Sequence, residues 1–389
     1  HTANRRQRQM CIRDRSNKSV LLRLDLNAPI ENGFVTNKER IYRSIPTITH
    51  IINKDCSLIL MSHLGRPEEN NEFQPKYSLK PVVKVLEEIL DREIPIYSLE
   101  ELEKLNQKPT ISILENSRFY VGEKDNDVGL SNRLSDLADI FVMDAFATSH
   151  RAHASTTGVI RFSKEACAGL LLDEELTALT KVKKNADHSI AILGGAKIST
   201  KLNLIKSLSS SMEKIILGGG LANTCLAAQG FNIGKSLIEE SMLEEAYEIS
   251  MDEKIVIPDS VIVSESPDSK GRIVSPDAIS DNEAIFDISS NFLNSVSSFI
   301  EGAGTILWNG PMGFFERENF NKGTMQIADM IVSSKGFSVA GGGDTIAAAE
   351  KSGVLNKINY VSTAGGAFLE FMEGRDLPAI EALIKNNRN

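Results

Sequence analysis

The chain has few cysteines and no long apolar run. Its four cysteines are far apart in 389 residues and form no C-x-x-C pair. This spacing argues against a disulfide framework or a zinc knuckle and is typical of a reducing compartment, so we expect a cytoplasmic location. No apolar run approaches the roughly 20 residues of a membrane span, so we expect no membrane association. The net charge of −9 argues against a general nucleic-acid binder.

The common nucleotide-binding fingerprints are also missing. The stretch GFNIGKS (230–236) has three residues between glycine and Gly-Lys, where a P-loop needs four. No G-x-G-x-x-G follows an expected strand, which weakens a nucleotide-dependent oxidoreductase, and there is no protein-kinase H-R-D signature. A nucleotide site in this chain must therefore rest on other glycine-rich turns.

Residues 1–15 are unusual because they hold five arginines and no initiator methionine. We interpret them as a translated artefact or a disordered basic tail and leave them out of the fold argument. This basic segment has no apolar core after it, so we expect no signal peptide. No Gly-, Ser- or Pro-rich linker divides the rest, and the helical pattern of 170–187 is the candidate joint between two lobes.

Short apolar runs alternate with helical patterns throughout, which predicts an α/β fold with mostly parallel sheets covered by helices. The two halves differ in composition. Of the glycines, 6 precede residue 190 and 21 follow it, whereas 14 arginines precede it and 4 follow it. Because ligands of doubly wound sheets bind outside the carboxyl ends of the strands, the residues at those ends predict different ligands for the two halves.

In the first half the expected strands end in cationic groups. SHLGRP (62–67) places His63 and Arg66 after a strand, and DAFATSHRAHAST (144–156) gathers two histidines around Arg151. A polar turn or a metal site is the alternative for these motifs, but converging arginines favour a small, highly anionic ligand. Arg23 lies within a strand, where a paired structural charge is the alternative. Arg40 lies in a helical pattern and is by default a surface residue.

In the second half the expected strands end in glycine. In SVAGGGDT (338–345) three glycines precede Asp344 and a helical stretch, which favours a phosphate cradle with Mg²⁺ between phosphate and carboxylate. The alternative is a tight turn capped by Asp344. GGAKISTK (194–201) predicts Lys197 and Lys201 on one helix face near a phosphate. WNGPMGFFE (308–316) contains the only tryptophan, which we expect in the core, and Glu316, a candidate for a ribose hydroxyl.

Eight of these stretches together resemble the phosphoglycerate kinase family, in a bacterial form. From about Ser16 onward they occur in the family's order: LLRLDLNAP, SHLGRP, ILENSRF, DAFATSHRAHAS, GGAKISTK, WNGPMGFFE, GGGDT and STAGGAFLEFMEG. The resemblance implies a two-lobed monomer with two Rossmann-like lobes joined by a hinge helix. It implies phosphoryl transfer between 1,3-bisphosphoglycerate and ADP, which gives 3-phosphoglycerate and ATP.

The resemblance also implies site residues and domain boundaries. It assigns the acid to residues 16–169 and the nucleotide to residues 188–372, with 170–187 between them and 373–389 packing back on the first domain. The implied acid-binding residues are Asp25, Asn27, Arg40, His63, Arg66, Arg118 and Arg151, with Arg23 and His153 close by. The implied nucleotide-binding residues are Gly195, Lys197, Lys201, Asn309, Glu316, Gly342, Gly343, Asp344 and Thr345, and Asp344 is the implied Mg²⁺ ligand.

For the mechanism we expect direct in-line transfer after closure of the lobes, with Arg40, Lys197 and Lys201 as catalytic residues. A phosphohistidine intermediate is the alternative role for the histidines. A nucleotide-binding module without catalysis is the alternative function. The chain departs from the family at Asn223 and Cys225, where aromatic residues are frequent, and this change alters the packing expected beside the nucleotide.

Overall fold

The computed structural model describes residues 18–184 and 188–387. Residues 1–15, interpreted above as an artefact or a disordered tail, lie outside the described residues, as do the last three residues of the predicted 170–187 helix. The chain forms two compact units. Unit 1 combines the residues up to Leu176 with those from Asp376 onward, and unit 2 comprises Thr177–Arg375.

Unit 1 is built on a six-stranded parallel sheet of order β5-β6-β4-β1-β7-β8. The strands are β1 (Ser19–Leu24), β4 (Ser57–Met61), β5 (Ile96–Tyr97), β6 (Ile111–Leu114), β7 (Ile140–Asp144) and β8 (Glu165–Ala168). The chain moves from β1 to one side and later returns to add β7 on the other side, so the switch point of the topology lies at β1. A two-stranded hairpin, β2 (Ile30–Glu31) and β3 (Phe34–Val35), follows β1.

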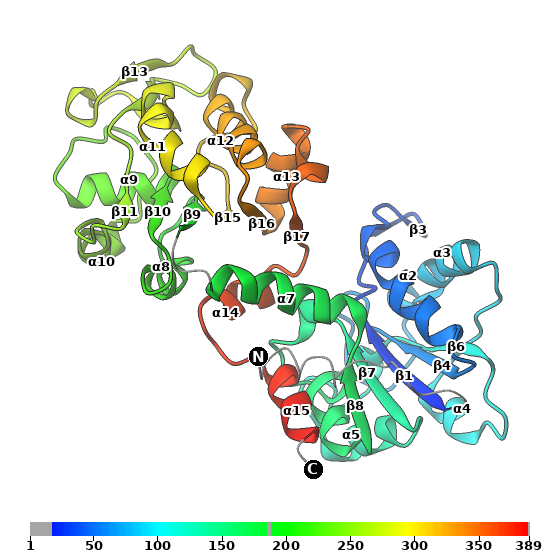
Figure 1. Ribbon diagram of the computed structural model, residues 1–389. Coiled ribbons are helices and arrows are strands. Elements are labelled where there is room, and N and C mark those ends of the chain that lie inside the picture. Colours follow the sequence, from blue (N-terminus) through cyan, green and yellow to red (C-terminus); the bar gives the residue numbers. More distant parts are fainter. Residues whose placement is uncertain (1–17, 185–187, 388–389) are drawn as a thin grey trace. The chain divides into compact units, whose positions relative to one another are not determined.

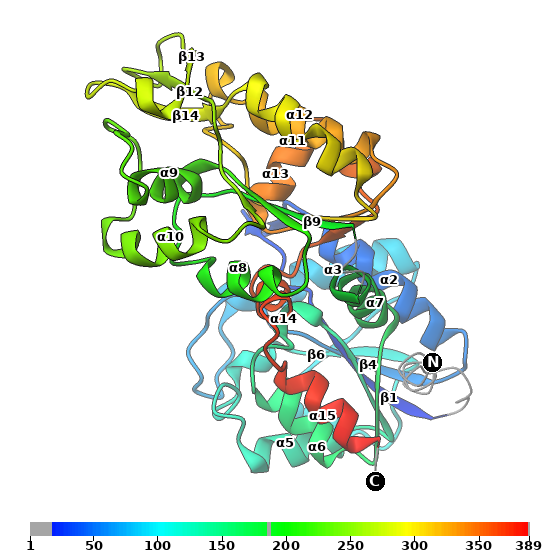
Figure 2. The same ribbon diagram turned by 60° about the vertical axis from the view of Figure 1, so that its left-hand side comes forward.

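Helices cover the sheet of unit 1. They are α2 (Glu39–Ile52), α3 (Lys80–Leu90), α4 (Leu99–Lys104), α5 (Val128–Ser135), α6 (Val159–Phe162) and α15 (Pro378–Asn386). Strand β1 alternates: Val20, Leu22 and Leu24 pack in one core with α2 and α3, so Arg23 points to the opposite face. The C-terminal helix α15 lies beside α6 (Figure 2), where the amide of Asn386 donates to the carbonyls of Ile160 and Ser163.

Unit 2 has a second parallel sheet, of order β11-β10-β9-β15-β16-β17. Its strands are β9 (Ser189–Leu193), β10 (Lys214–Leu217), β11 (Ile255–Val256), β15 (Thr305–Asn309), β16 (Phe337–Gly341) and β17 (Tyr360–Ser362). Strands β9, β10 and β11 form one half of the sheet in chain order, and β15, β16 and β17 form the other half, which begins beside β9. The switch point, where such sheets bind ligands, therefore lies between β9 and β15.

The helices of unit 2 are α8 (Leu202–Ser209), α9 (Gly219–Ala228), α10 (Leu243–Ser250), α11 (Ser290–Gly302), α12 (Lys322–Ser333), α13 (Gly343–Lys351) and α14 (Gly366–Met372). Helices α11, α12 and α13 (Figure 1) share one core with Trp308, which is fully buried. A small antiparallel sheet of order β13-β12-β14 is added: β12 (Val261–Ser264), β13 (Arg272–Val274) and β14 (Ala284–Ile288). The predicted fold class, two mostly parallel sheets covered by helices, is confirmed.

Helix α7 (Leu170–Lys184) carries the chain from unit 1 into unit 2. Its first turn is fixed to unit 1, because the Asp144 carboxylate accepts a hydrogen bond of 3.0 Å from the Leu172 amide and the Thr47 hydroxyl accepts one of 3.3 Å from the Leu170 amide. Among the described residues, no helix has the length and apolar character that crossing a bilayer requires.

Candidate functional site

In unit 1 the predicted acid-binding side chains gather at the carboxyl ends of four neighbouring strands. Asp25 and Asn27 follow β1, His63 and Arg66 follow β4, Arg118 follows β6, and Arg151 and His153 follow β7. Arg40 reaches the same edge from the first turn of α2: its Nη1 donates to the Asp25 carboxylate at 2.6 Å. Parallel pairing explains this convergence, because it brings every carboxyl end to one edge.

The backbone of the SHLGRP turn is held by two of these side chains. The Asn27 side-chain oxygen accepts a hydrogen bond of 2.9 Å from the Gly65 amide, and Arg118 Nη1 donates to the Gly65 carbonyl at 2.6 Å. Arg66 and Arg151 are exposed, whereas Arg118 is buried. The edge therefore combines fixed guanidinium groups with others that are free to close on a ligand.

The electrostatics of this edge are unfavourable without an anion. Burial lowers the pKa of Arg118, and the nearby charges of Arg151 and Arg66 lower it further. Burial and the same kind of repulsion lower the pKa of His153 to about 4. The negative charges of Glu123 and Glu69 oppose this effect on Arg118, and a bound anion would do the same.

Arg23 and His63 form a buried relay behind this edge. Arg23 Nη2 lies 3.1 Å from His63 Nδ1, and Arg23 Nε donates to Ser155 Oγ at 3.3 Å. Ser155 in turn donates through its hydroxyl and its amide to Glu123, at 2.5 and 2.9 Å. Burial lowers the pKa of Arg23 to about 10, while Glu123 and Asp25 raise it. Arg23 is thus a buried charge held by hydrogen bonds to Ser155, His63 and the Leu24 carbonyl, with the charges of Glu123 and Asp25 nearby.

The hydrogen bond from Arg23 fixes the tautomer of His63. An arginine can only donate, so Nδ1 of His63 is an acceptor and the ring proton is on Nε2. Burial and the surrounding arginines lower the pKa of His63 well below its usual value. We expect ¹⁵N chemical shifts of His63 to show a neutral ring with the proton on Nε2 at pH 7, since burial and the surrounding arginines lower its pKa. An imidazolium signal from His63 at pH 7 would contradict this assignment.

In unit 2 the switch point is closed by two glycines and one lysine. A Cβ at Gly194, after β9, would lie 1.8 Å from the Pro311 carbonyl, and one at Gly310, after β15, would lie 2.3 Å from the Gly194 carbonyl. The backbones meet closely enough for Lys201 to bind both strand ends: Nζ donates to the carbonyl of Gly194 and, at 2.6 Å, to that of Asn309. Burial lowers the pKa of Lys201 to about 8, although the negative charge of Asp344 acts to raise it.

The prediction that Lys197 and Lys201 share a helix face is wrong. Helix α8 begins only at Leu202, so both lysines lie in the turn before it. Gly195, at φ 124°, redirects this turn, and Lys201 folds back over the strand ends while Lys197 extends into solvent. The two ammonium groups therefore occupy different surroundings, one bound to carbonyls and one free to meet a phosphate.

The GGGDT turn places Asp344 in the first turn of α13, with Gly342 at the N-cap position and a φ of 98°. Asp344 and Gly343 are exposed. Thr345 is buried and structural: its hydroxyl donates to the Gly341 carbonyl at 2.7 Å and accepts from the Gly310 amide at 2.8 Å. Asn309 is also buried, and its amide nitrogen donates to Gly341 at 2.6 Å. These two side chains join the β15 and β16 ends.

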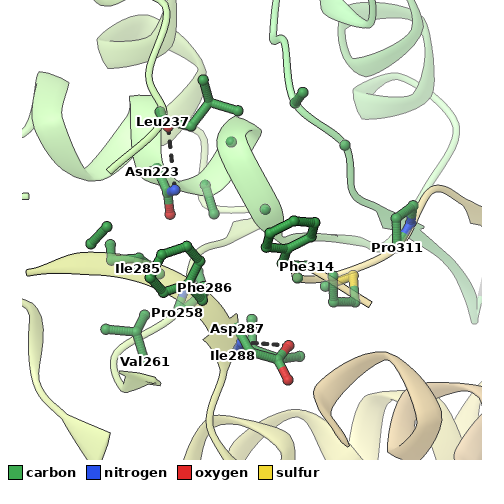
Figure 3. A pocket seen from close by; sticks show the side chains of 18 of the residues that line it. Asn223, Leu237, Pro258, Val261, Ile285, Phe286, Asp287, Ile288, Pro311 and Phe314 are labelled. Atoms are coloured by element: carbon green, nitrogen blue, oxygen red, sulfur yellow. Dashed lines mark hydrogen bonds between the residues drawn. The ribbon is translucent and has the colours of Figure 1, made fainter. Parts of the chain in front are cut away.

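A pocket of about 490 Å³ opens beside these turns (Figure 3). Its lining includes Gly195, Pro311, Glu316 and Asp344, together with Lys235 and residues of α9 and of the β14 strand. The walls are mostly apolar, with Leu237, Val261, Ile285, Phe286 and Phe314 around the space. A charged rim next to an apolar slot of this size suits a nucleotide, whose phosphates and base differ in the same way.

The wall formed by β14 could not be predicted from the sequence pattern. Phe286 and Asp287 line the pocket, but their strand belongs to an antiparallel sheet that the βα alternation did not predict. Asp287 accepts from the Gly323 amide at 2.8 Å, and burial raises its pKa to about 7. The detectable signal is an acid inside the apolar run AIFDI. Asn223, noted as a departure, lines the pocket, whereas Cys225 is fully buried and does not.

Asp344 is the side chain that fits a magnesium ion here. Its exposed carboxylate borders the pocket beside the helix N-terminus that would receive phosphates. The described part of the chain holds no group of three or more His, Cys, Asp or Glu residues arranged for a metal. One carboxylate matches Mg²⁺, because this ion keeps waters and shares substrate phosphates instead of using an all-protein cage.

Comparisons with known proteins agree on one family. The model of the family "Phosphoglycerate kinase" matches residues 12–375. A phosphoglycerate kinase of Coxiella burnetii is 44% identical over 378 residues, covering 95% of this chain and 96% of the relative. One of Francisella philomiragia is 45% identical over 379 residues, with the same coverage.

Solved structures give the same result. The structure of the Coxiella burnetii phosphoglycerate kinase matches with a TM-score of 0.92 and 43% identity, covering 96% of this chain and 98% of that one. The crystal structure of the Pyrococcus horikoshii phosphoglycerate kinase matches with a TM-score of 0.79 and 30% identity, covering 96% and 97%.

Proposed function

The chain belongs to the phosphoglycerate kinase family, and from this premise we propose how its two units carry out the reaction. The protein is a phosphotransferase that acts between 1,3-bisphosphoglycerate and ADP and gives 3-phosphoglycerate and ATP, reversibly. The observation that supports the assignment of ligands is the contrast between the strand ends. Unit 1 gathers repelling guanidinium groups, and unit 2 offers glycine-rich turns around an apolar pocket.

The acid binds to the strand ends of unit 1. Its phosphate and carboxylate are compact anions, for which the planar guanidinium fork is the best-matched partner. His63 presents Nε2–H as a neutral donor, and Asp25 and Asn27 orient Arg40 and the Gly65 turn. The proposed acid-binding set is Asp25, Asn27, Arg40, His63, Arg66, Arg118, Arg151 and His153.

The nucleotide binds to the pocket of unit 2. Its base lies in the apolar part, and its phosphates lie against the N-terminus of α13 and the Gly195 turn. Glu316, on the pocket wall, is placed for a ribose hydroxyl, and Asn309 and Thr345 act by holding the Gly310 and Gly341 backbones. Bound to Asp344, Mg²⁺ would neutralise charge on the phosphates.

The transfer itself requires positioning and charge stabilisation. An oxygen of the terminal phosphate of ADP forms a bond to phosphorus as the acyl phosphate P–O bond breaks, and the released carboxylate keeps the electron pair. Arg40, Lys197 and Lys201 are proposed to bind the equatorial oxygens of the moving group. A phosphohistidine at His63 is disfavoured, because Arg23 occupies Nδ1 and Nε2 carries the proton.

The decisive experiment is a coupled assay of ATP formation. With 1,3-bisphosphoglycerate, ADP and Mg²⁺ we expect turnover that stops when any one of the three is omitted. A nucleotide-binding module without catalysis would bind ADP and form no ATP, and an oxidoreductase would change the absorbance of a nicotinamide cofactor instead. Incubation with ATP alone, followed by mass spectrometry, should leave no phosphate on histidine.

The two ligands must meet for in-line transfer, so the proposal includes closure of the units about α7 once both are bound. We expect small-angle scattering to give a smaller radius of gyration with 3-phosphoglycerate and a non-hydrolysable ATP analogue together than with either alone. An unchanged radius with both ligands at saturating concentration would contradict closure.

We also propose that the protein is a cytoplasmic monomer with no nucleic-acid or membrane partner. The three described cysteines, Cys56, Cys167 and Cys225, are buried and lie far apart in the sequence, which matches a reducing compartment. Sedimentation of the purified chain tests the monomeric state.

A further inference from the structure

The apolar part of the unit 2 pocket contains one side-chain amide, that of Asn223. The residue is 4% exposed and comes from α9. Its neighbours around the space are Leu237, Ile285 and Phe286 (Figure 3). A buried polar group in an apolar wall costs free energy unless it has a hydrogen-bond partner, so the nitrogen and the oxygen of the Asn223 amide each require one.

The orientation of the Asn223 amide follows from its one partner. Its Nδ2 donates to the Leu237 carbonyl at 3.3 Å. Because only the nitrogen can donate to a carbonyl, Oδ1 must point the other way. Figure 3 shows this oxygen directed away from Leu237, toward the space in front of Ile285 and Phe286. In the described parts of the chain, no donor lies within hydrogen-bond distance of Oδ1.

The position along α9 places this acceptor one helical turn beyond the glycines that lie against the Gly195 turn. Gly219 and Gly220 lie against the Gly195–Ala196 turn: a Cβ at Gly219 would lie 2.9 Å from the Gly195 carbonyl. Asn223 is three and four residues further on, so it lies on the same helix face one turn away. With phosphates at the Gly195 turn, the nucleotide continues along this face of α9, and Asn223 lies among the apolar residues Leu237, Ile285 and Phe286, where the base is proposed to bind.

We propose that Asn223 makes this kinase select adenine nucleotides by accepting a hydrogen bond from the 6-amino group of the base. This inference rests on the nucleotide site proposed above and names its specificity. A 6-oxo purine would bring an acceptor against Oδ1, which repels it and leaves both oxygens without a donor. A purine with hydrogen at position 6 would lose the hydrogen bond without the repulsion.

The test compares diphosphates that differ only at this edge: ADP, inosine diphosphate and purine riboside diphosphate. Consumption of 1,3-bisphosphoglycerate is followed, so the readout does not depend on the base. For the unmodified protein we expect kcat/KM for ADP to exceed that for inosine diphosphate by about 10-fold or more, with purine riboside diphosphate between them. Equal values for the three nucleotides would overturn the proposal without any variant.

The variant Asn223→Leu should reduce the ADP preference to about 3-fold or less, chiefly by losing activity with ADP. The matched control is Gln229→Leu, the same chemical change at an exposed position of the α9 C-terminus outside the pocket, which should keep the preference of the unmodified protein. An Asn223→Leu variant that is folded and keeps the full preference would overturn the proposal. Absence of turnover with every nucleotide in the unmodified protein would instead contradict the proposed function.

Discussion

Replacing Arg40 with alanine should lower kcat by about 10²- to 10⁴-fold, because the loss of a transition-state contact to the moving phosphoryl group costs on the order of 3–5 kcal/mol. Arg40 is suited to this role because the protein holds it in place through only one of its nitrogen atoms. One nitrogen, Nη1, is bound to Asp25 at 2.6 Å, and the side chain remains 33% exposed. The guanidinium is therefore oriented by the protein, while its other donors have no hydrogen-bond partner among the described residues.

The division between kcat and KM distinguishes this role from ground-state binding. If Arg40 binds the phosphoryl group in the transition state, kcat and kcat/KM should fall together, and KM for the acid should change by less than about 10-fold. Arg40→Lys should recover only part of the rate, because an ammonium keeps the charge and loses the planar fork. Arg92→Ala, at an exposed arginine after α3, is the matched control and should behave as the unmodified protein. Near-normal turnover of Arg40→Ala would remove Arg40 from the mechanism.

A structural explanation of such a loss can be tested with Asp25. Removing Arg40 leaves the Asp25 carboxylate, which is 10% exposed, without its ion pair. If the rate fell only because Asp25 became unpaired, Asp25→Asn combined with Arg40→Ala would restore it. We expect the double variant to remain as slow as Arg40→Ala, since the missing group is the cation.

The arginine edge could be predicted from the sequence because it depends on two simple regularities. Apolar runs mark strands, and the residues after parallel strands meet at one edge. Arg66, Arg118 and Arg151 follow from these rules alone. Arg40 does not, since the first turn of an amphipathic helix is normally solvated, and the distance to Asp25 depends on how α2 packs on the sheet. For Arg40 the family resemblance supplied what local pattern lacked.

The nucleotide pocket was harder to predict because much of its wall is not at a parallel strand end. Phe286 and Asp287 lie in an antiparallel strand whose partners are set by long-range pairing. Thr345 and Asn309 are expected to contact the nucleotide. In the structure the Thr345 hydroxyl and the Asn309 amide nitrogen bind the Gly341 carbonyl, whereas Asn309 Oδ1 is buried without a partner among the described residues. Motif position identifies the turn, but the direction of each side chain depends on the φ of glycines such as Gly310 and Gly342.

Replacing Lys201 with methionine should lower kcat by about 10²- to 10³-fold, the usual effect of removing one preorganised donor to a developing negative charge. Methionine keeps the length and apolar stem of the side chain and removes the ammonium that joins the Gly194 and Asn309 carbonyls. Lys197→Met should act mainly on KM for the nucleotide, because Lys197 is exposed and makes no such internal bonds. Lys206→Met, at an exposed position of α8, is the matched control.

The pH profile gives Lys201 a signature that a purely structural role would not produce. Burial disfavours the charged ammonium and lowers its pKa to about 8, so the group is a cation below that pH and neutral above it. Since kcat/KM reports the free enzyme, its value for ADP should fall as the pH rises through about 8, and Lys201→Met should lack this step. Lys197→Met should retain it. A kcat/KM for ADP that stays constant from pH 7 to about 10 in the unmodified protein would contradict this prediction, because an ordinary lysine with a pKa near roughly 10.4 remains charged over most of that range. It would show that nucleotide binding does not depend on a lysine whose pKa is lowered by burial.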